Sequence, residues 1–117
     1  MKHSKDDFVV LQKAYDLVVD LIPRIHRFPR SFKFTLGDRL ENCALDVEQL
    51  LVEARWRRDR AELLDRANAR LDRMRYLLRF AHDFGLLKIR SLGFLAGKID
   101  EVGRLVGSWR KKQTVSP

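Results

Sequence analysis

Hydrophobic residues recur along this 117-residue chain at alternating spacings of three and four positions, in four separate stretches. An α-helix completes a turn in about 3.6 residues, so this spacing places the hydrophobic side chains of each stretch on one face of a helix. We therefore predict four amphipathic helices and no β-strand. The four hydrophobic faces are predicted to consist of Phe8, Leu11, Tyr15, Val18, Ile22 and Ile25; Leu36, Leu40, Cys43, Val47, Leu50 and Ala54; Leu64, Ala67, Leu71, Met74, Leu78 and Ala81; and Leu92, Leu95, Ile99, Val102, Val106 and Trp109.

Residues that favour helix ends separate the first two stretches. Pro23 has no backbone donor and crowds the carbonyl of Val19, so we expect a kink or break in the first helix at this position. Pro29 then marks the connection. Thr35 resembles the capping residue at the start of the second helix, which we expect to end near Trp56.

The remaining boundaries complete a bundle. Asp59, with Glu62 three positions later, resembles the start of the third helix, and Gly85 is placed to end it. Four helices of about 20 to 25 residues joined by short turns predict an all-α fold, an up-down-up-down antiparallel four-helix bundle. The chain is predicted to form a single domain, residues 1–117, with residues 1–5 and 111–117 as frayed tails. Cys43 and Met74 fall on hydrophobic faces, so we expect them to pack in the core.

The charge of the chain is strongly positive. Its formal net charge is +8, and arginine outnumbers lysine by sixteen to eight. The planar guanidinium group binds phosphates and carboxylates through two parallel hydrogen bonds, which favours nucleic acid, or an acidic protein, as a partner. The alternative is that a GC-rich genome has replaced lysine with arginine without functional pressure. Composition alone does not decide between the two.

Arginine is concentrated between residues 54 and 79, where nine arginines and four acidic residues leave a net charge of +5. The candidate binding residues are the turn arginines (Arg55, Arg57, Arg58 and Arg60), the ridge arginines (Arg66, Arg70 and Arg73) and the flank arginines (Arg75 and Arg79). At about 100° per residue, the ridge arginines share one side of the predicted third helix, and the flank arginines lie on the other. The alternative is a solvated face, in which pairs such as Arg66 with Glu62 neutralise part of the charge. The excess of one sign favours binding of phosphate or of an acidic partner.

Four glycines interrupt the predicted last helix, and each costs about 1 kcal/mol relative to alanine in a helix interior. They share one arc beside the hydrophobic face, the glycine arc (Gly93, Gly97, Gly103 and Gly107). Small residues let another backbone approach closely, so we predict that the arc forms an oligomer interface, with Asp100 and Arg104 making polar contacts there. The alternative is a close approach within the bundle itself.

The chain offers little for catalysis. It has one cysteine and three scattered histidines, no Glu-x-x-His pair and no glycine-rich phosphate loop, so we expect no catalytic residue, no metal and no cofactor. One pattern remains, because Arg75 and His82 have the spacing of the arginine–histidine signature of helical HEPN ribonucleases. Abundant arginine makes such a match arise readily by chance. A HEPN-like ribonuclease using this pair stays an alternative function.

The sequence also bears on the cellular compartment in which the protein is expected. No hydrophobic run reaches the roughly 18 residues needed to cross a bilayer. The first residues lead into an amphipathic pattern rather than a signal peptide, and a single cysteine suits a reducing compartment. We expect a soluble, cytoplasmic protein without membrane partners.

A resemblance to a known family rests on three ordered segments, FPRSFKFTLGDRLENCALDVEQLLVEARWRRDR, LLRFAHDFGLL and EVGRLVGSW. They are similar to the accessory variability determinant (Avd) proteins of diversity-generating retroelements, within a larger group of four-helix bundles that includes proteins encoded in intervening sequences of bacterial 23S rRNA. The likeness runs from about Tyr15 to Trp109. Residues 28–31, 34–37 and 39–40 are its most specific part, because they combine unusual loop residues in a fixed order.

The resemblance implies a barrel-like homopentamer of four-helix bundles with a basic surface. Such a protein associates with the retroelement's reverse transcriptase and with its nucleic acid, template RNA or cDNA. It is not an enzyme, and it supports the synthesis of adenine-mutagenised cDNA, which then replaces a variable repeat in a target gene. By position, the turn, ridge and flank arginines match the family's basic region, with no role implied for any single one. A structural bundle that binds an acidic protein stays a third alternative.

Overall fold

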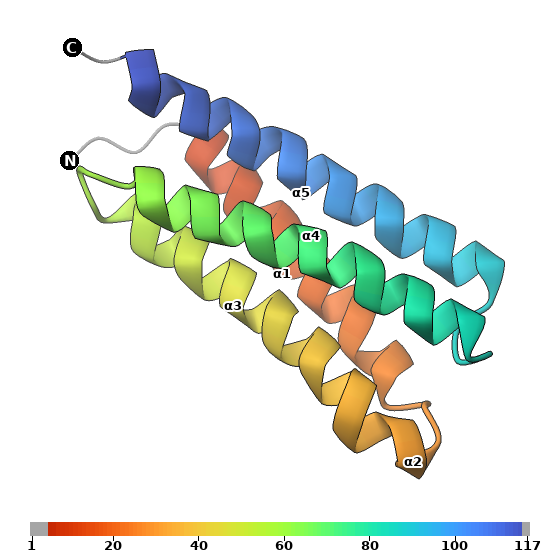
Figure 1. Cartoon of the computed structure of the whole chain (residues 1–117). Helices are drawn as coiled ribbons and strands as arrows, with labels where there is room; N and C mark the ends of the chain where they lie inside the picture. The colour runs from red at the N-terminus through yellow and green to blue at the C-terminus, as the bar shows by residue number, and fades with distance from the viewer. Residues whose placement is uncertain (1–4, 116–117) are drawn as a thin grey trace.

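The computed structural model describes residues 5–115, and every regular element among them is helical (Figure 1). Four long helices make up the molecule: α1 (Lys5–Ile25), α3 (Asp38–Arg55), α4 (Ala61–Asp83) and α5 (Ile89–Val115). A short helix, α2 (Arg30–Phe32), and a π-helical turn, η1 (Lys33–Gly37), lead directly into α3. The predicted all-α class is confirmed.

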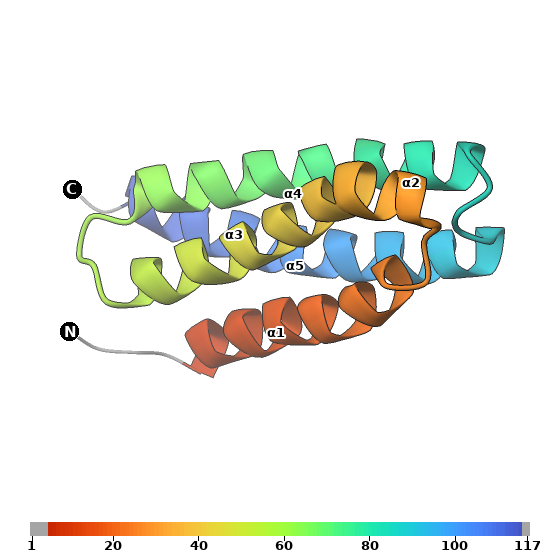
Figure 2. The same cartoon turned by 90° about the horizontal axis from the view of Figure 1, so that it is seen from below.

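The four long helices lie side by side with alternating direction. Helix α1 packs against α3 and α5, and α4 packs against the same two helices. Figure 2 shows α1 and α4 on opposite sides of the bundle, with α3 and α5 between them. The predicted up-down-up-down antiparallel four-helix bundle is therefore confirmed.

The core is formed largely by the predicted hydrophobic faces of α3, α4 and α5. Every residue of the third predicted face, from Leu64 to Ala81, is buried. Cys43 and Met74 are core packing residues, as predicted. Burial of an aliphatic side chain contributes about 1.5–3 kcal/mol, so these three continuous faces hold the helices together.

The hydrophobic face of α1 differs from the prediction. Phe8 and Tyr15, which were expected in the core, are 57% and 58% exposed. Val10, Ala14, Leu17 and Leu21 fill the core in their place, together with Ile25, which was predicted there. The predicted Leu11 and Val18 are partly buried against this core. The prediction was wrong because α1 carries hydrophobic residues around much of its circumference, so two neighbouring rows both satisfy the helical spacing. Packing against α3 and α5 selects one of them.

The end of α1 is set by a close contact as well as by proline. The helix continues through Pro23 and ends at Ile25, the last residue of the predicted face, so the chain does not break at the proline itself. Pro23 lies in the last turn of α1 and has no backbone N–H, so the helix loses one hydrogen bond close to its end. A Cβ atom at Gly37 would lie 2.8 Å from Cγ2 of Ile25, so only glycine fits where the returning chain meets α1.

The second long helical segment begins earlier than predicted. The carbonyl of Pro29 accepts the backbone N–H groups of Phe32 and Lys33, both at 2.9 Å, and helix follows from Arg30 onward. Thr35 lies inside this segment, and its hydroxyl donates to backbone carbonyls one turn back at 3.3 Å instead of capping a helix end. A threonine side chain can cap the start of a helix or bond to a carbonyl one turn back within it, so Thr35 did not mark where the helix begins.

The end of α4 follows the prediction. Gly85 has a φ of 77°, in the left-handed region that favours glycine. Its N–H donates to the carbonyl of His82 at 2.9 Å, and the N–H of Leu86 donates to the carbonyl of Ala81 at 2.8 Å. These bonds satisfy the last carbonyls of the helix and turn the chain toward α5.

Two other boundaries shift in the structure. Helix α4 follows Arg60, which makes no side-chain capping bond, so Asp59 is not its cap. Helix α5 continues to Val115, so residues 111–115 extend the last helix, and Lys5 already belongs to α1. The rest of the predicted tails, residues 1–4 and 116–117, lies outside the described residues.

Candidate nucleic-acid interface

The turn arginines lie between α3 and α4, and two of them hold the end of the bundle together. Arg60 is only 8% exposed, and its Nη1 lies 3.9 Å from Oδ2 of the buried Asp7 on α1. The same guanidinium stands 5.3 Å from the centre of the Trp109 ring on α5. Arg55 lies over the Phe8 ring at 4.0 Å. Both groups are therefore in contact with aromatic rings from other helices of the same chain.

The other two turn arginines face outward. Nη2 of Arg57 donates to Oε1 of Glu53 at 2.8 Å, in a surface ion pair one helical turn long. Arg58 is exposed and forms no ion pair with any described residue. Surface pairs contribute about 0–1 kcal/mol, so Arg57 can exchange Glu53 for another anion at low cost.

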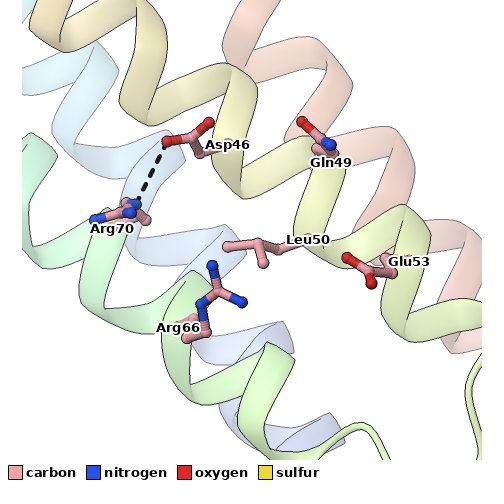
Figure 3. Close-up of a pocket in the computed structure, with 6 residues that line it drawn as sticks. All are labelled: Asp46, Gln49, Leu50, Glu53, Arg66 and Arg70. Carbon is pink, nitrogen blue, oxygen red and sulfur yellow. Dashed lines mark ion pairs between the residues drawn. The ribbon is translucent and has the colours of Figure 1, made fainter.

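The ridge arginines lie along the side of α4 that faces α3. Nε of Arg70 is 3.5 Å from Oδ2 of Asp46 on α3 (Figure 3). That Nε is buried and makes no hydrogen bond within residues 5–115, so the pair is loose. Arg66 and Arg73 are exposed and have no ion-pair partner among the described residues, and the predicted pair of Arg66 with Glu62 is not formed. Two of the three guanidinium groups are available to an external anion.

A groove separates α3 from α4 beside the ridge arginines. Its volume of about 220 Å³ is smaller than the range of about 300–1,000 Å³ typical of small-molecule sites. The groove is lined by Arg66 and Arg70 on α4 and by Asp46, Gln49, Leu50 and Glu53 on α3 (Figure 3). It suits an extended ligand that lies along the surface better than an enclosed small molecule.

The buried thiol of Cys43 shows how close the cationic groups come to the seam between α3 and α4. Burial raises the pKa of this thiol, and the positive charges of Arg73, Arg70 and Arg39 act in the opposite direction. Arg39 is exposed on α3 and has no ion-pair partner in the described part of the chain. Arg39 was not among the predicted binding residues, although its i,i+4 spacing with Cys43 places both on one side of α3. The exposed guanidinium groups along the seam therefore come from both helices, from Arg39 on α3 and from Arg66 and Arg73 on α4.

The two flank arginines differ in their contacts, because Arg75 is held by two carboxylates and Arg79 by none among the described residues. Arg75 turns toward α5, where its Nε donates to Oδ1 of Asp100 at 3.1 Å, and its Nη1 donates to Oδ1 of Asp72 at 2.6 Å. Asp100, predicted to make a contact between subunits, joins α5 to α4 within the chain. Arg79 is exposed and forms no ion pair with the residues described.

The glycine arc is mostly open within the chain. A Cβ atom added at Gly93, Gly97 or Gly107 would meet nothing within 4 Å. A Cβ atom at Gly103 would lie 3.2 Å from Nη2 of Arg75. Close approach within the bundle therefore accounts for Gly103 alone, and the other three glycines have no packing partner among the described residues.

Three phenylalanines, Phe32, Phe80 and Phe84, gather where α2 lies beside the end of α4. The rings of Phe32 and Phe84 stack at 5.5 Å with an interplanar angle of 24°, and those of Phe80 and Phe84 at 6.3 Å and 15°. Phe80 and Phe84 nevertheless remain 52% and 58% exposed. The i,i+4 spacing of Phe80 and Phe84 was the sequence signal that could have indicated that their rings lie side by side.

The candidate ribonuclease pair has structural partners. Arg75 forms ion pairs with Asp72 on α4 and Asp100 on α5, and so joins the two helices. Nδ1 of His82 lies 2.9 Å from the carbonyl of Leu87, in the turn that leads into α5, so this nitrogen carries the proton and donates. Within residues 5–115, no three histidine, cysteine or acidic side chains come together in a way that could hold a metal ion.

The geometry defines the class of protein: a basic antiparallel four-helix bundle with exposed guanidinium groups along the seam between α3 and α4. A family model described as bAvd-like matches residues 8–113. The chain therefore belongs to the bAvd-like family of accessory proteins, which confirms the resemblance seen in its sequence. No curated protein matches the chain. None of the helices between residues 5 and 115 combines the length and apolar character that crossing a bilayer requires.

Proposed function

We propose that this protein is a non-catalytic accessory protein of a diversity-generating retroelement, which binds the element's reverse transcriptase and its nucleic acid. The match to the bAvd-like family over residues 8–113 is the observation that carries the proposal. The exposed guanidinium groups of Arg39, Arg66 and Arg73 support it, because such groups bind phosphate oxygens strongly when no carboxylate competes.

In this proposal the bundle binds template RNA or cDNA through phosphates while the polymerase performs the chemistry. Phosphate contacts position a nucleic acid but carry no sequence information. Binding should therefore depend strongly on salt and weakly on sequence. That property suits an accessory protein that holds a template RNA and its mutagenised cDNA near a polymerase.

The proposal includes assembly into a homopentamer, as the family resemblance implies. Five chains of net charge +8 carry 5 × 8 = +40, so a ring presents many phosphate contacts at high effective concentration. The open glycines of α5 support a contact between subunits, because each one weakens the helix by about 1 kcal/mol without any packing partner in the described chain.

The salt dependence of RNA binding tests the electrostatic mechanism. The double variant Arg66→Gln/Arg73→Gln removes two exposed charges that have no acidic partner among the described residues. Each phosphate contact with a single strand changes the slope of log affinity against log salt by about 0.7. We expect the slope to become shallower by about 1.4 and the affinity at about 0.1 M salt to fall about 25-fold, measured by fluorescence anisotropy with labelled RNA.

A matched control removes the same number of charges from paired positions. Lys98 pairs with Asp20 at 2.9 Å and Arg110 with Asp65 at 2.8 Å, and neither belongs to the candidate binding residues. The variant Lys98→Gln/Arg110→Gln should lose much less affinity. Equal losses in the two double variants would assign binding to net charge rather than to the ridge arginines, and an unchanged slope in both would contradict electrostatic binding of nucleic acid.

Substitution of Gly97 tests the assembly. Gly97→Ala should raise the free energy of unfolding of the chain by about 0.5–1 kcal/mol, because alanine favours the helix and its Cβ atom has open space. Gly97→Leu should leave the helical circular dichroism intact but split the assembly. Light scattering measures the size, and an unchanged size for Gly97→Leu would contradict a subunit contact at the glycine arc.

A further inference from the structure

One row of side chains on α4 continues from the ridge arginines into the phenylalanine cluster. The row follows a 4-3-4-3-4 spacing and consists of Arg66, Arg70, Arg73, Leu77, Phe80 and Phe84. Arg70 contacts Asp46 on α3 and Phe84 stacks on Phe32 of α2, so the row faces the part of the chain that runs from α2 into α3. At about 1.5 Å per residue the row is about 27 Å long, enough for several nucleotides in extended form.

The aromatic half of this row is exposed although its rings touch one another. Phe80, Phe84 and Phe32 form a run of nearly parallel rings. Only Phe32 packs against the core, while Phe80 and Phe84 remain more than half exposed. Figures 1 and 2 place α2 and the end of α4 at the same end of the bundle. The chain itself therefore leaves more than half of the surface of two stacked aromatic side chains uncovered there.

The cationic half of the row carries more positive than negative charge. Arg66, Arg73 and the neighbouring Arg39 have no acidic partner among the described residues. Asp46, paired with Arg70, and Glu53 on the groove wall oppose them, and Asp83 is exposed beside the phenylalanines. A polyanion lying along the row would meet guanidinium groups first and aromatic rings beyond them.

We propose that this row binds single-stranded nucleic acid, with phosphates at Arg66, Arg73 and Arg39 and with unpaired bases stacked on Phe80 and Phe84. The inference rests on the proposed function and adds the strandedness of the ligand and the surface that holds it. Base faces are accessible in a single strand and covered in a duplex, so exposed rings distinguish the two. Protein interfaces are also enriched in arginine and aromatic residues, so the experiment measures assembly size beside nucleic-acid affinity.

The experiment compares one oligonucleotide in two forms. The variant Phe80→Ala/Phe84→Ala is titrated against a fluorescein-labelled single-stranded 15-mer RNA and against the same RNA annealed to its complement. Loss of stacking should weaken single-strand binding about 10-fold or more with an unchanged salt slope, and should leave duplex binding unchanged. Phe84→Trp should retain single-strand binding, because it keeps an aromatic face. Circular dichroism checks that each variant stays folded.

A matched control is available on another helix. Tyr15 of α1 is 58% exposed, like Phe84, but lies outside the row. Tyr15→Ala should leave both affinities unchanged. An equal loss for single strand and duplex, or no loss at all, would overturn the stacking proposal. If nucleic-acid affinity is unchanged and light scattering shows a different assembly size, the phenylalanines dock a protein, and the proposal is likewise overturned.

The outcome is separable from that of the proposed function. If Arg66→Gln/Arg73→Gln weakens RNA binding while the phenylalanine variant does not, electrostatic binding stands and base stacking fails. If neither variant changes binding, both fail. Selective loss of single-strand binding in the phenylalanine variant, with duplex binding intact, supports the assignment of this row.

Discussion

The turn between α3 and α4 and the seam along the same two helices are both rich in arginine, yet the structure uses the residues differently. At the turn, Arg55 and Arg60 lie against aromatic rings, and Arg60 is almost completely buried. Along the seam, Arg66 and Arg73 are exposed, with no acidic partner among the described residues. A high density of arginine therefore does not locate a binding surface by itself.

The difference arises from what the other helices bring to each region. Figure 1 shows that the start of α1, the turn and the end of α5 gather at one end of the bundle. Two of the turn arginines are reached from there: Asp7 of α1 and Trp109 of α5 contact Arg60, and Phe8 of α1 contacts Arg55. Along the seam, α3 supplies Asp46 and Glu53 to the groove wall, and of these two Asp46 alone pairs with a ridge arginine among the described residues.

Removal of Arg60 gives the largest expected contrast between the two regions. Loss of one member of a buried ion pair costs about 3–5 kcal/mol, and the 3.9 Å separation from Asp7 favours the lower end. We expect Arg60→Ala to lower the free energy of unfolding by about 3 kcal/mol and Arg73→Ala by less than about 0.5 kcal/mol. Urea unfolding measures both. Similar losses in the two variants would break the distinction between turn and seam.

The stacking of Arg55 on Phe8 has a smaller expected effect. A cation–π contact at the surface contributes about 0.5–1 kcal/mol. A double-mutant cycle with Arg55→Ala and Phe8→Leu should give a coupling energy of that size, from urea unfolding of the four proteins. A coupling energy near zero would mean that Arg55 is as available to ligands as the seam arginines are.

The smallest expected effect is on the thiol of Cys43. Arg73 lowers the pKa of this thiol against the larger, raising effect of burial. Arg73→Gln should therefore raise the pKa further and move the pH profile of iodoacetamide alkylation, which needs the thiolate, to higher pH. Arg79→Gln, which removes a charge not named among the causes, should leave the profile in place. An unchanged profile in Arg73→Gln would mean that the charge of Arg73 lies too far from the thiol to act on it.

The same raised pKa has a consequence for stability. A group whose pKa is higher in the folded than in the unfolded state contributes stability that is fully present below the unfolded pKa. That contribution is lost as the pH rises through the folded value. Wild-type protein should therefore lose stability relative to Cys43→Val in the alkaline range of a urea unfolding series.

The fold was predictable where each helix has one hydrophobic row. In α4 the row from Leu64 to Ala81 is bordered by arginines and acids, and every member of it is buried. In α1 two rows compete, and periodicity selected the row with Phe8 and Tyr15 although the core contains the row with Leu17. Nothing local distinguishes these rows, because the choice depends on the faces that α3 and α5 present.

The candidate site was predictable only in part. Helical spacing placed Arg66, Arg70 and Arg73 on one side of α4, where the structure also has them. The partner of Arg70 is Asp46 on another helix, and the partners of Arg75 include Asp100 on a third. Contacts of this kind depend on how helices dock, so periodicity along one helix could not reveal them.

By itself the sequence determined the four helices, the identity of most core residues and a surplus of guanidinium groups, since periodicity, helix-ending residues and net charge are properties of the chain alone. Only the tertiary structure decided which row of α1 is buried and which arginines remain exposed. The physical reason is that burial and ion pairing depend on distances of a few ångströms between side chains on different helices. Those distances exist only after the bundle has formed.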